Sequence, residues 1–429
     1  GGDKGRGRQQ GESRMNSPTP VVFENARILD GSSAEGEYDR FVRVEGGRIA
    51  EISDRPIAAA GARRIDLKGR TLMPGLIDCH VHVVATTADL GRNSRLPDAL
   101  VAFGAADIMR GMLARGFTTV RDLGGATQAL VDALALGLIE GPRLVICGKA
   151  LSQTGGHSDL RGRYDSRPAD DLADRLGSLG RLCDGLESVR QAARDELRKG
   201  ARFIKIMANG GVASPTDPIH VLQFSRAEIE AIVEEARNAH TYVAAHLYTD
   251  EAIARAVECG VHSVEHANLI EAPTAALMKE KGAVACPTLV TYEMLASEGA
   301  SLGLPPDSVA KIDDVRIRSP RSLEILKEAG VPMAYGSDLL GAMHRHQSEE
   351  FVIRGRVLPT IDVIRSATVE AASVLGMSGE IGCVSVGAAA DLIVVDGDPL
   401  ADLSLLTGQG RHIPVIMQAG RLAKDEAFA

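Results

Sequence analysis

Hydrophobic and polar positions follow one pattern at the two ends of the chain and another in the middle. Near each end, short alternating runs are separated by glycine-rich turns, which is typical of antiparallel strands. These runs occupy residues 21–31, 38–53, 63–75, 387–400 and 412–423. Because the two groups are alike in character, the economical interpretation is that they meet as one small β-sandwich.

The middle of the chain alternates short apolar runs with longer amphipathic segments. The apolar runs lie at residues 75–83, 118–124, 143–152, 202–210, 242–248, 262–269, 283–290 and 332–340. The helical candidates lie at residues 99–116, 188–200, 225–240, 250–260 and 320–330. Eight strands alternating with helices predict an α/β fold, a (β/α)8 TIM-like barrel.

These patterns set the expected domain boundaries. Residues 74–382 are predicted to form the barrel, and residues 15–73 and 383–429 the β-sandwich. Ser225 is a plausible N-cap, and Glu228 three residues later completes a capping box. A chain of 429 residues is long enough for one large barrel with an accessory layer.

Composition favours a globular enzyme-sized protein with an aliphatic core. Hydrophobic residues make up 45% of the chain, whereas aromatic residues make up 3% and tryptophan is absent. The net charge of −9 argues against a nucleic-acid partner. No run of eighteen apolar residues occurs, so we expect no membrane partner.

The N-terminus and the cysteines bear on processing and location. Residues 1–14 have the composition of an expression-vector remnant and carry a net charge of +2, so the remainder carries −11. The segment after Met15 has no signal-peptide pattern, although a signal removed upstream would escape this reasoning. Six dispersed cysteines without a C-x-x-C motif predict reduced thiols and a cytoplasmic location.

The candidate chemistry begins with LIDCHVHVV at residues 76–84, where His80 and His82 interrupt an apolar strand. Residues i and i+2 of a strand point the same way, so the two imidazoles share a face. An H-x-H pair alone is weak evidence, because most such pairs are structural or solvated. Lys205, inside the apolar run RFIKIMANG, is a second anomaly, because lysine is rarely buried without a partner. It is either paired with a carboxylate or converted by CO2 into a carbamate, an anion that can bridge two cations.

Further metal-capable residues stand where other barrel strands should end. His246 closes YVAAHLY, His266 lies in HSVEHANL, and Asp338 lies in PMAYGSDLL. With His80, His82 and Lys205 they would project into one barrel mouth, where active sites of this fold lie. Six such residues in order on strands 1, 4, 5, 6 and 8 predict a metal centre that activates water and polarises a carbonyl group.

The motifs resemble those of the amidohydrolase superfamily. They are PGLIDCHVH, TTVRDLGG, FIKIMANGG, AAHLYT, SVEHAN and YGSDLLGAMHRHQSEEF, with VGAAADLIVVDGDPL near the end. The resemblance spans residues 21–422. It points to the imidazolonepropionase-related branch that holds metal-dependent Xaa-Pro dipeptidases (prolidases) and ochratoxin-hydrolysing amidohydrolases.

The resemblance implies a binuclear centre with two divalent metal ions, for which zinc is the default. It assigns His80, His82 and Asp338 to the first metal and His246 and His266 to the second, with carbamylated Lys205 and a hydroxide bridging them. The hydroxide attacks the carbonyl, and Asp338 shuttles its proton to the leaving amine. None of these six positions departs from the family pattern.

Three further residues are candidates for substrate contacts. Tyr248 matches an H-x-Y tyrosine that helps bind the substrate carboxylate in the resembled dipeptidases. A role in packing alone is an equally weighted alternative. His157 follows the third strand in a glycine-rich loop and would hydrogen-bond the oxyanion or the substrate, unless it is a surface histidine. His344, just after Asp338, would line the pocket or support the metal ligands, and His346 competes for that role.

Other polar residues are expected to lie outside the chemistry. Glu265 alternates with His266 and is predicted to point into the layer outside the barrel. Arg121 and Asp122 are expected to form a structural pair. The polar segment 158–185 is predicted to form a lid that shapes the pocket.

The sequence therefore predicts a hydrolase that cleaves an amide bond next to a free carboxylate. Candidate substrates are N-acyl amino acids, Xaa-Pro dipeptides and ochratoxin A. Alternatives on the same centre are a lactonase or phosphotriesterase and a cyclic-amide hydrolase, and a deaminase also stays open. A non-enzymatic scaffold would have eroded ligands, whereas all six are present. The resemblance also implies a homo-oligomer.

Overall fold

The computed structural model describes residues 19–169 and 171–426. The prediction of an expression remnant at residues 1–14 therefore lies outside the described residues. No helix in the described part of the chain is long and apolar enough to cross a membrane.

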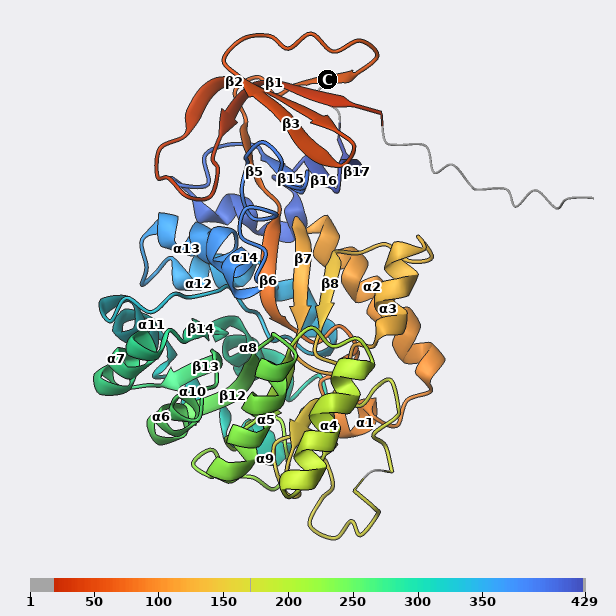
Figure 1. Ribbon diagram of the computed structural model, residues 1–429, viewed down its shortest axis with the longest axis vertical. Helices are drawn as coiled ribbons and strands as arrows, with labels where there is room; N and C mark the ends of the chain where they lie inside the picture. Colours follow the sequence, from red (N-terminus) through yellow and green to blue (C-terminus); the bar gives the residue numbers. More distant parts are fainter. Residues whose placement is uncertain (1–18, 170, 427–429) are drawn as a thin grey trace, which may run out of the picture.

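The two ends of the chain meet in one eight-stranded sheet, which lies at the top of the molecule in Figure 1. Its strands follow the order β17-β16-β15-β5-β1-β2-β3, with β4 paired to β1. Their bounds are β1 (Val21–Ile28), β2 (Glu37–Glu45), β3 (Arg48–Ser53), β4 (Arg63–Asp66), β5 (Thr71–Pro74), β15 (Leu392–Val395), β16 (Val415–Gln418) and β17 (Arg421–Asp425).

The junction between the two ends is the antiparallel pair β5–β15, in which Pro74 lies opposite Leu392 and Thr71 opposite Val395. Side chains of both ends, including Phe23 and Val394, share one hydrophobic core. The predicted meeting of the two segments is confirmed. Hydrogen bonds make the strands one continuous sheet rather than two separate layers.

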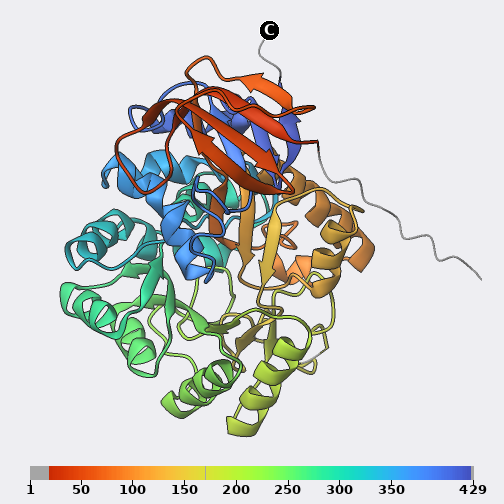
Figure 2. The same ribbon diagram turned by 45° about the horizontal axis from the view of Figure 1, so that its top comes forward.

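The middle of the chain supplies parallel strands with helices on their outer side (Figure 2). One group has the order β6-β7-β8, and the other has the order β10-β9-β11-β12-β13-β14. Their bounds are β6 (Leu76–Val81), β7 (Phe117–Asp122), β8 (Arg143–Ile146), β9 (Ala150–Ser152), β10 (Gly180–Leu182), β11 (Ile204–Met207), β12 (Val243–Thr249), β13 (Ser263–Leu269) and β14 (Val284–Cys286). Near-continuous burial along these strands is typical of a parallel sheet covered on both faces.

Two of the eight predicted runs differ from continuous strands. The run at residues 143–152 divides into β8 and β9, because Gly148 adopts a left-handed φ of 70° that turns the chain. The run at residues 332–340 is not a regular strand. It nevertheless lies between β14 and β6, since the Ala334 amide donates to Ala285 at 2.8 Å and the Cys79 amide donates to Tyr335 at 2.7 Å.

The predicted helices are all present, with ends that shift by one or two residues. Ser225 caps α5 and Glu228 completes the capping box, as predicted. The helices are α1 (Leu90–Asn93), α2 (Asp98–Ala114), α3 (Gln128–Ala135), α4 (Leu186–Arg198), α5 (Arg226–Asn238), α6 (Asp250–Glu258), α7 (Ala272–Lys281), α8 (Leu289–Met294), α9 (Pro306–Val309), α10 (Ile312–Arg316), α11 (Ser319–Glu328), α12 (Glu349–Arg354), α13 (Thr360–Ser366) and α14 (Val369–Val374). A π-helix, Leu295–Gly299, continues α8.

Candidate metal centre

A cavity lies at the carboxyl ends of the parallel strands. All six metal-capable residues predicted from the sequence line it: His80, His82, Lys205, His246, His266 and Asp338. They come from β6, β11, β12, β13, the segment that follows β6 and the segment that follows α11. Residues separated by up to 258 positions in the chain are thus brought to one cavity because parallel strands end on the same side.

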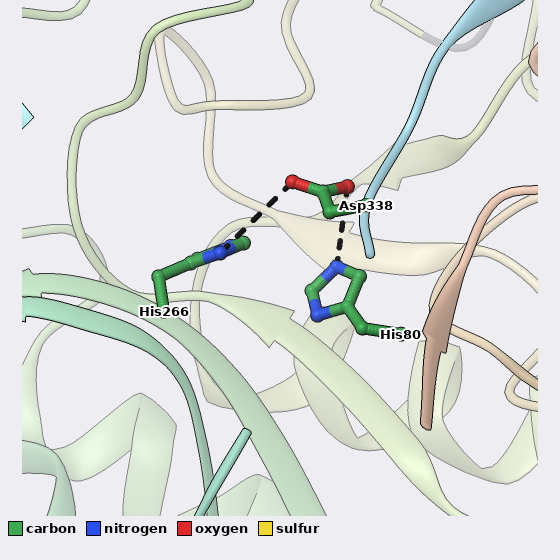
Figure 3. A group of neighbouring side chains, drawn as sticks. All are labelled: His80, His266 and Asp338. Atoms are coloured by element: carbon green, nitrogen blue, oxygen red, sulfur yellow. Dashed lines mark ion pairs between the residues drawn. The ribbon is translucent and has the colours of Figure 1, made fainter. Parts of the chain in front are cut away.

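Three of these side chains form a compact group around Asp338 (Figure 3). The ligand atoms of His80, His266 and Asp338 all lie within 4.8 Å of one another. Asp338 Oδ1 lies 3.3 Å from His80 Nε2 and 3.2 Å from His82 Nε2, and its Oδ2 lies 3.9 Å from His266 Nδ1. The Asp338 carboxylate is therefore the common neighbour of three imidazoles.

Hydrogen bonds behind three of the imidazoles fix which ring nitrogen can face the cavity. His82 Nδ1 lies 3.1 Å from the carbonyl of Gly124, and His266 Nδ1 lies 2.7 Å from Thr288 Oγ1. His80 Nδ1 is engaged in the same way by a carboxylate, described below. In each case Nε2 is the nitrogen left for a ligand, which is the usual arrangement behind metal-binding histidines.

His246 uses its ring in the opposite sense. Its Nε2 lies 3.2 Å from the carbonyl of Gly210, which leaves Nδ1 as the free nitrogen. Its ring contacts that of His266, with centroids 4.7 Å apart. His246 and His266 therefore offer one free nitrogen each from adjacent strands.

Glu265 differs from its predicted position. Its carboxylate is fully buried inside the parallel strands, where Oε2 lies 2.8 Å from His80 Nδ1 and Oε1 accepts a hydrogen bond of 2.6 Å from Ser263. The prediction that it points outside the barrel was wrong. The reason is local: His266 and Ala267 have positive φ values of 73° and 55°, which interrupt the alternation of β13.

Arg121 and Asp122 do not pair with each other, contrary to expectation. The Arg121 guanidinium is fully buried and donates at 2.8 Å to Glu265, and it also donates to the Cys79 carbonyl at 2.7 Å. Asp122 instead accepts backbone hydrogen bonds, including one of 2.8 Å from Val83. Neighbouring strand residues face opposite sides, so each found its own partner.

The electrostatics of the site favour metal binding. Burial lowers the pKa of His246 and of His266 well below the ordinary value, so both imidazoles are neutral, as metal ligands must be. Burial alone would raise the pKa of Asp338, but the neighbouring imidazoles, His80 first, outweigh it and hold that pKa well below its usual range.

Lys205 has the environment of a reactive amine. Its side chain is 1% exposed, and burial lowers its pKa. The carboxylates of Glu265 and Asp338 act in the opposite direction but do not restore the ordinary value. A buried amine that is easily deprotonated can react with CO2 to give an anionic carbamate, which fits between two cations. The donor set of imidazoles, a carboxylate and this lysine therefore suits a zinc-type centre.

Two of the three predicted substrate residues line the cavity. The ring of His157 stacks on that of His246, with centroids 4.1 Å apart, and its Nδ1 is bonded to Ser214 Oγ at 2.6 Å. This leaves Nε2 as the available nitrogen. Tyr248 is buried beside His266 at a centroid distance of 5.3 Å. Their positions agree with the predicted roles, which stay predictions.

The loop that carries Ser214 holds His157 in place. Ser214 donates to Asp217, whose Oδ2 accepts from Gln223 at 2.9 Å and lies 3.5 Å from His157 Nδ1. The ammonium group of Lys311 donates to the Ser214 carbonyl at 2.7 Å. The loop is therefore anchored through its backbone as well as its side chains.

His344 lies outside the cavity lining. Its Nε2 is bonded to the Ala85 carbonyl at 3.1 Å, and burial lowers its pKa to about 3. His346 lies 2.7 Å from Glu298 instead. The geometry thus gives His344 a structural contact and does not support its predicted contact with substrate.

Tyr292 is a cavity residue that the sequence did not reveal. It lies on α8, is 1% exposed, and donates a hydrogen bond of 3.0 Å from its hydroxyl to that of Tyr248. A tyrosine in a short apolar helix has no distinguishing sequence signal. The predicted lid contributes Ser158, Leu160 and Leu179 to the cavity wall.

Parallel strands whose carboxyl ends bring imidazoles, a buried amine and a carboxylate into one cavity have the arrangement of a metal-dependent hydrolase. The chain belongs to the amidohydrolase family, whose sequence pattern matches residues 71–422. This family is generally metal-dependent, and the chain is a hydrolase that acts on amide or peptide C–N bonds.

Several known proteins are similar to this chain. A crystal structure of an amidohydrolase is 53% identical and has a TM-score of 0.94, covering 95% of this chain and 100% of that chain. A prolidase crystallised with N-methylphosphonate-L-proline is 50% identical, with the same TM-score and coverage. Ochratoxinase of Aspergillus niger is 31% identical over 373 residues, which is 82% of this chain and 75% of that protein.

Proposed function

We propose that the protein is a binuclear metal-dependent amidohydrolase on a closed (β/α)8 barrel. It cleaves an amide bond next to a free carboxylate, as in an N-acyl amino acid or an Xaa-Pro dipeptide. The observation that carries this proposal is the convergence of all six candidate ligands on one cavity. The similarity to a prolidase and to ochratoxinase supports the substrate class, and ochratoxin A is itself a candidate.

The ligand assignment follows the superfamily pattern together with the free ring nitrogens. One metal would be held by Nε2 of His80 and of His82 together with the Asp338 carboxylate. The other would be held by Nδ1 of His246 together with His266. Carbamylated Lys205 would be shared by both. Two divalent ions bound there supply an acidified water and polarise the scissile carbonyl.

The side chains of this protein would then move protons and position the substrate. The Asp338 carboxylate accepts the proton of the attacking water and delivers it to the leaving amine. The carboxylate is ionised in the resting site, as a proton acceptor must be. His157 is held by Ser214 through Nδ1, and as an imidazolium it would donate from Nε2 to the carbonyl oxygen as negative charge develops there.

The substrate carboxylate is proposed to lie against the paired hydroxyls of Tyr248 and Tyr292. Burial raises the pKa of both phenols, so both keep their proton. Tyr292 donates its own proton to Tyr248, which leaves the Tyr248 hydroxyl to donate to the carboxylate. Among the residues that the structure describes, Lys205 is the one lining residue with an ammonium or guanidinium group, and it lies among the proposed metal ligands. Neutral donors are therefore what this wall offers a carboxylate.

A substrate panel tests the proposal. Zinc-loaded protein is assayed on N-acyl amino acids including ochratoxin A, on a prolyl dipeptide, on a lactone, on a cyclic amide and on a phosphotriester, each with and without chelator. Chelator-sensitive hydrolysis of the first two classes is expected. Hydrolysis of only the lactone, the cyclic amide or the phosphotriester would replace the proposal by the corresponding alternative.

A further inference from the structure

The part of the cavity that would receive the acyl group of the substrate determines which of the two substrate types the enzyme prefers. We infer that it takes an uncharged, apolar acyl group, so that N-acyl amino acids are better substrates than dipeptides with a free α-ammonium. This inference rests on the proposed function and deepens it. An N-acyl amino acid and a dipeptide share the scissile amide and the carboxylate, and they differ at the acyl end.

Within residues 19–169 and 171–426, the cavity lining has no carboxylate to spare for an ammonium group. Lys205 and Asp338 are its two residues with acidic or strongly basic side chains. Asp338 Oδ1 already lies 3.3 Å from His80 and 3.2 Å from His82. The two lining phenols, Tyr248 and Tyr292, carry no formal charge that could neutralise a cation.

The remaining wall is mainly aliphatic and is assembled from several parts of the chain. The segment after β6, the predicted lid, the loop after β11, the π-helix and the segment after Asp338 all contribute. The aliphatic side chains are Leu90, Leu160, Leu179, Val212, Leu295 and Leu340. Such a wall stabilises an apolar acyl group by burial.

An α-ammonium at the acyl end would have to leave water without gaining an ionic partner. Ser158 and Thr291 could accept hydrogen bonds from it through their hydroxyls, but a hydroxyl does not compensate a buried charge. Burying an unpaired cation is costly, so the free dipeptide pays a penalty that its uncharged counterpart does not. The size and shape of the two can otherwise be identical.

The test compares leucyl-proline with 4-methylpentanoyl-proline, which lacks only the α-amino group. At pH 7.0 the kcat/KM of the uncharged compound is expected to be about tenfold higher, which corresponds to about 1.4 kcal/mol. A ratio of about three or less overturns the inference, and any larger ratio supports it. Hydrolysis of both compounds upholds the proposed function whatever the ratio, whereas hydrolysis of neither removes the proposed function and the inference together.

The pH dependence of that ratio is a second readout that belongs to the substrate. An α-amino group has a pKa of about 7.7–8.0, so the dipeptide loses its charge between pH 7 and pH 9. The two compounds share the scissile amide and the carboxylate, so the effect of the titratable lining groups on those shared parts cancels in the ratio. These groups are His80, His82, His157, Lys205, His246, Tyr248, His266, Tyr292 and Asp338. The advantage of the uncharged compound is therefore expected to shrink as the pH rises. A ratio that stays constant overturns the inference.

A matched pair of variants locates the effect in the wall. Leu160 is partly exposed, so a polar residue is tolerated there. Leu160→Asp is expected to lower the preference for the uncharged compound severalfold relative to Leu160→Asn, which has the same shape without the charge. Equal preferences in the two variants would overturn the placement of the acyl group beside Leu160. The wild-type comparison stands if either variant fails to fold.

Discussion

Glu265→Gln is the most informative change at the site, because it alters the hydrogen bonding behind His80, a proposed metal ligand, without altering shape. Glu265 is fully buried between the imidazole of His80 and the guanidinium of Arg121, at 2.8 Å from each. In the wild type, the carboxylate accepts a hydrogen bond from each of these two groups. A glutamine has one accepting oxygen, so it can satisfy only one of the two donors.

The substitution is expected to change metal affinity because it changes the tautomer of His80. If the glutamine oxygen stays with Arg121, its amide group donates to Nδ1, and the ring proton moves to Nε2. Nε2 is the nitrogen that faces Asp338, and a protonated nitrogen cannot bind a metal. We expect a 10- to 100-fold, or about 1.4 to 2.7 kcal/mol, loss of zinc affinity.

The same change also removes one partner of a buried ion pair. We expect the free energy of unfolding of the metal-free protein to fall by about 3 kcal/mol, because Arg121 stays charged and loses its counterion. Chemical denaturation in chelator measures this loss, and competition with a chromophoric chelator measures zinc affinity. The two quantities are therefore read independently.

Glu350→Gln is the matched control. Glu350 and Arg354 form another fully buried pair, with an N–O distance of 2.7 Å, and neither contacts a candidate ligand. This variant is expected to lose stability to a similar extent and to keep wild-type zinc affinity. Unchanged zinc affinity in Glu265→Gln, or an equal loss in both variants, would refute the tautomer argument.

Three further outcomes are expected. Ser214→Ala should lower kcat on the order of tenfold with little change in KM, measured by steady-state kinetics, because the ring of His157 loses its hydrogen bond. Tyr292→Phe should raise KM severalfold, and unchanged KM would place the carboxylate elsewhere. Burial alone would raise the pKa of Glu265, but Arg121 and His80 outweigh burial and lower that pKa. The ionised Glu265 side chain therefore stabilises the folded protein above pH 4.5, and this contribution is lost as the pH falls below that value. The stability difference between wild type and Glu265→Gln in chelator should therefore shrink between pH 7 and pH 3.5 in urea titrations.

The strand-end residues could be predicted because each depends on a short local pattern. His80, His246 and Asp338 interrupt apolar runs, and a parallel fold carries the ends of such runs to one side. The structure brings all six predicted ligands to one cavity for this reason. The meeting of the N- and C-terminal strands followed from their common character in the same way.

The features that were missed depend on backbone geometry or on tertiary contacts. Two successive residues with positive φ, His266 and Ala267, interrupt the alternation beside Glu265, which lies inside the strands. A histidine and an alanine at these positions do not predict a positive φ. Gly148 divides one predicted strand, although glycine within an apolar run has several possible meanings. Tyr292 reaches the cavity only because α8 folds over it.

The number of metal ions bound by the active protein tests the central claim most directly. After loading with zinc and bicarbonate and removal of excess metal, elemental analysis should find two zinc ions per wild-type chain. Lys205→Ala should bind fewer than two and lose activity. Lys149→Ala, which removes another buried lysine from outside the cavity lining, should retain both ions. One zinc ion per fully active wild-type chain, or full activity in Lys205→Ala, would contradict a lysine-bridged binuclear centre.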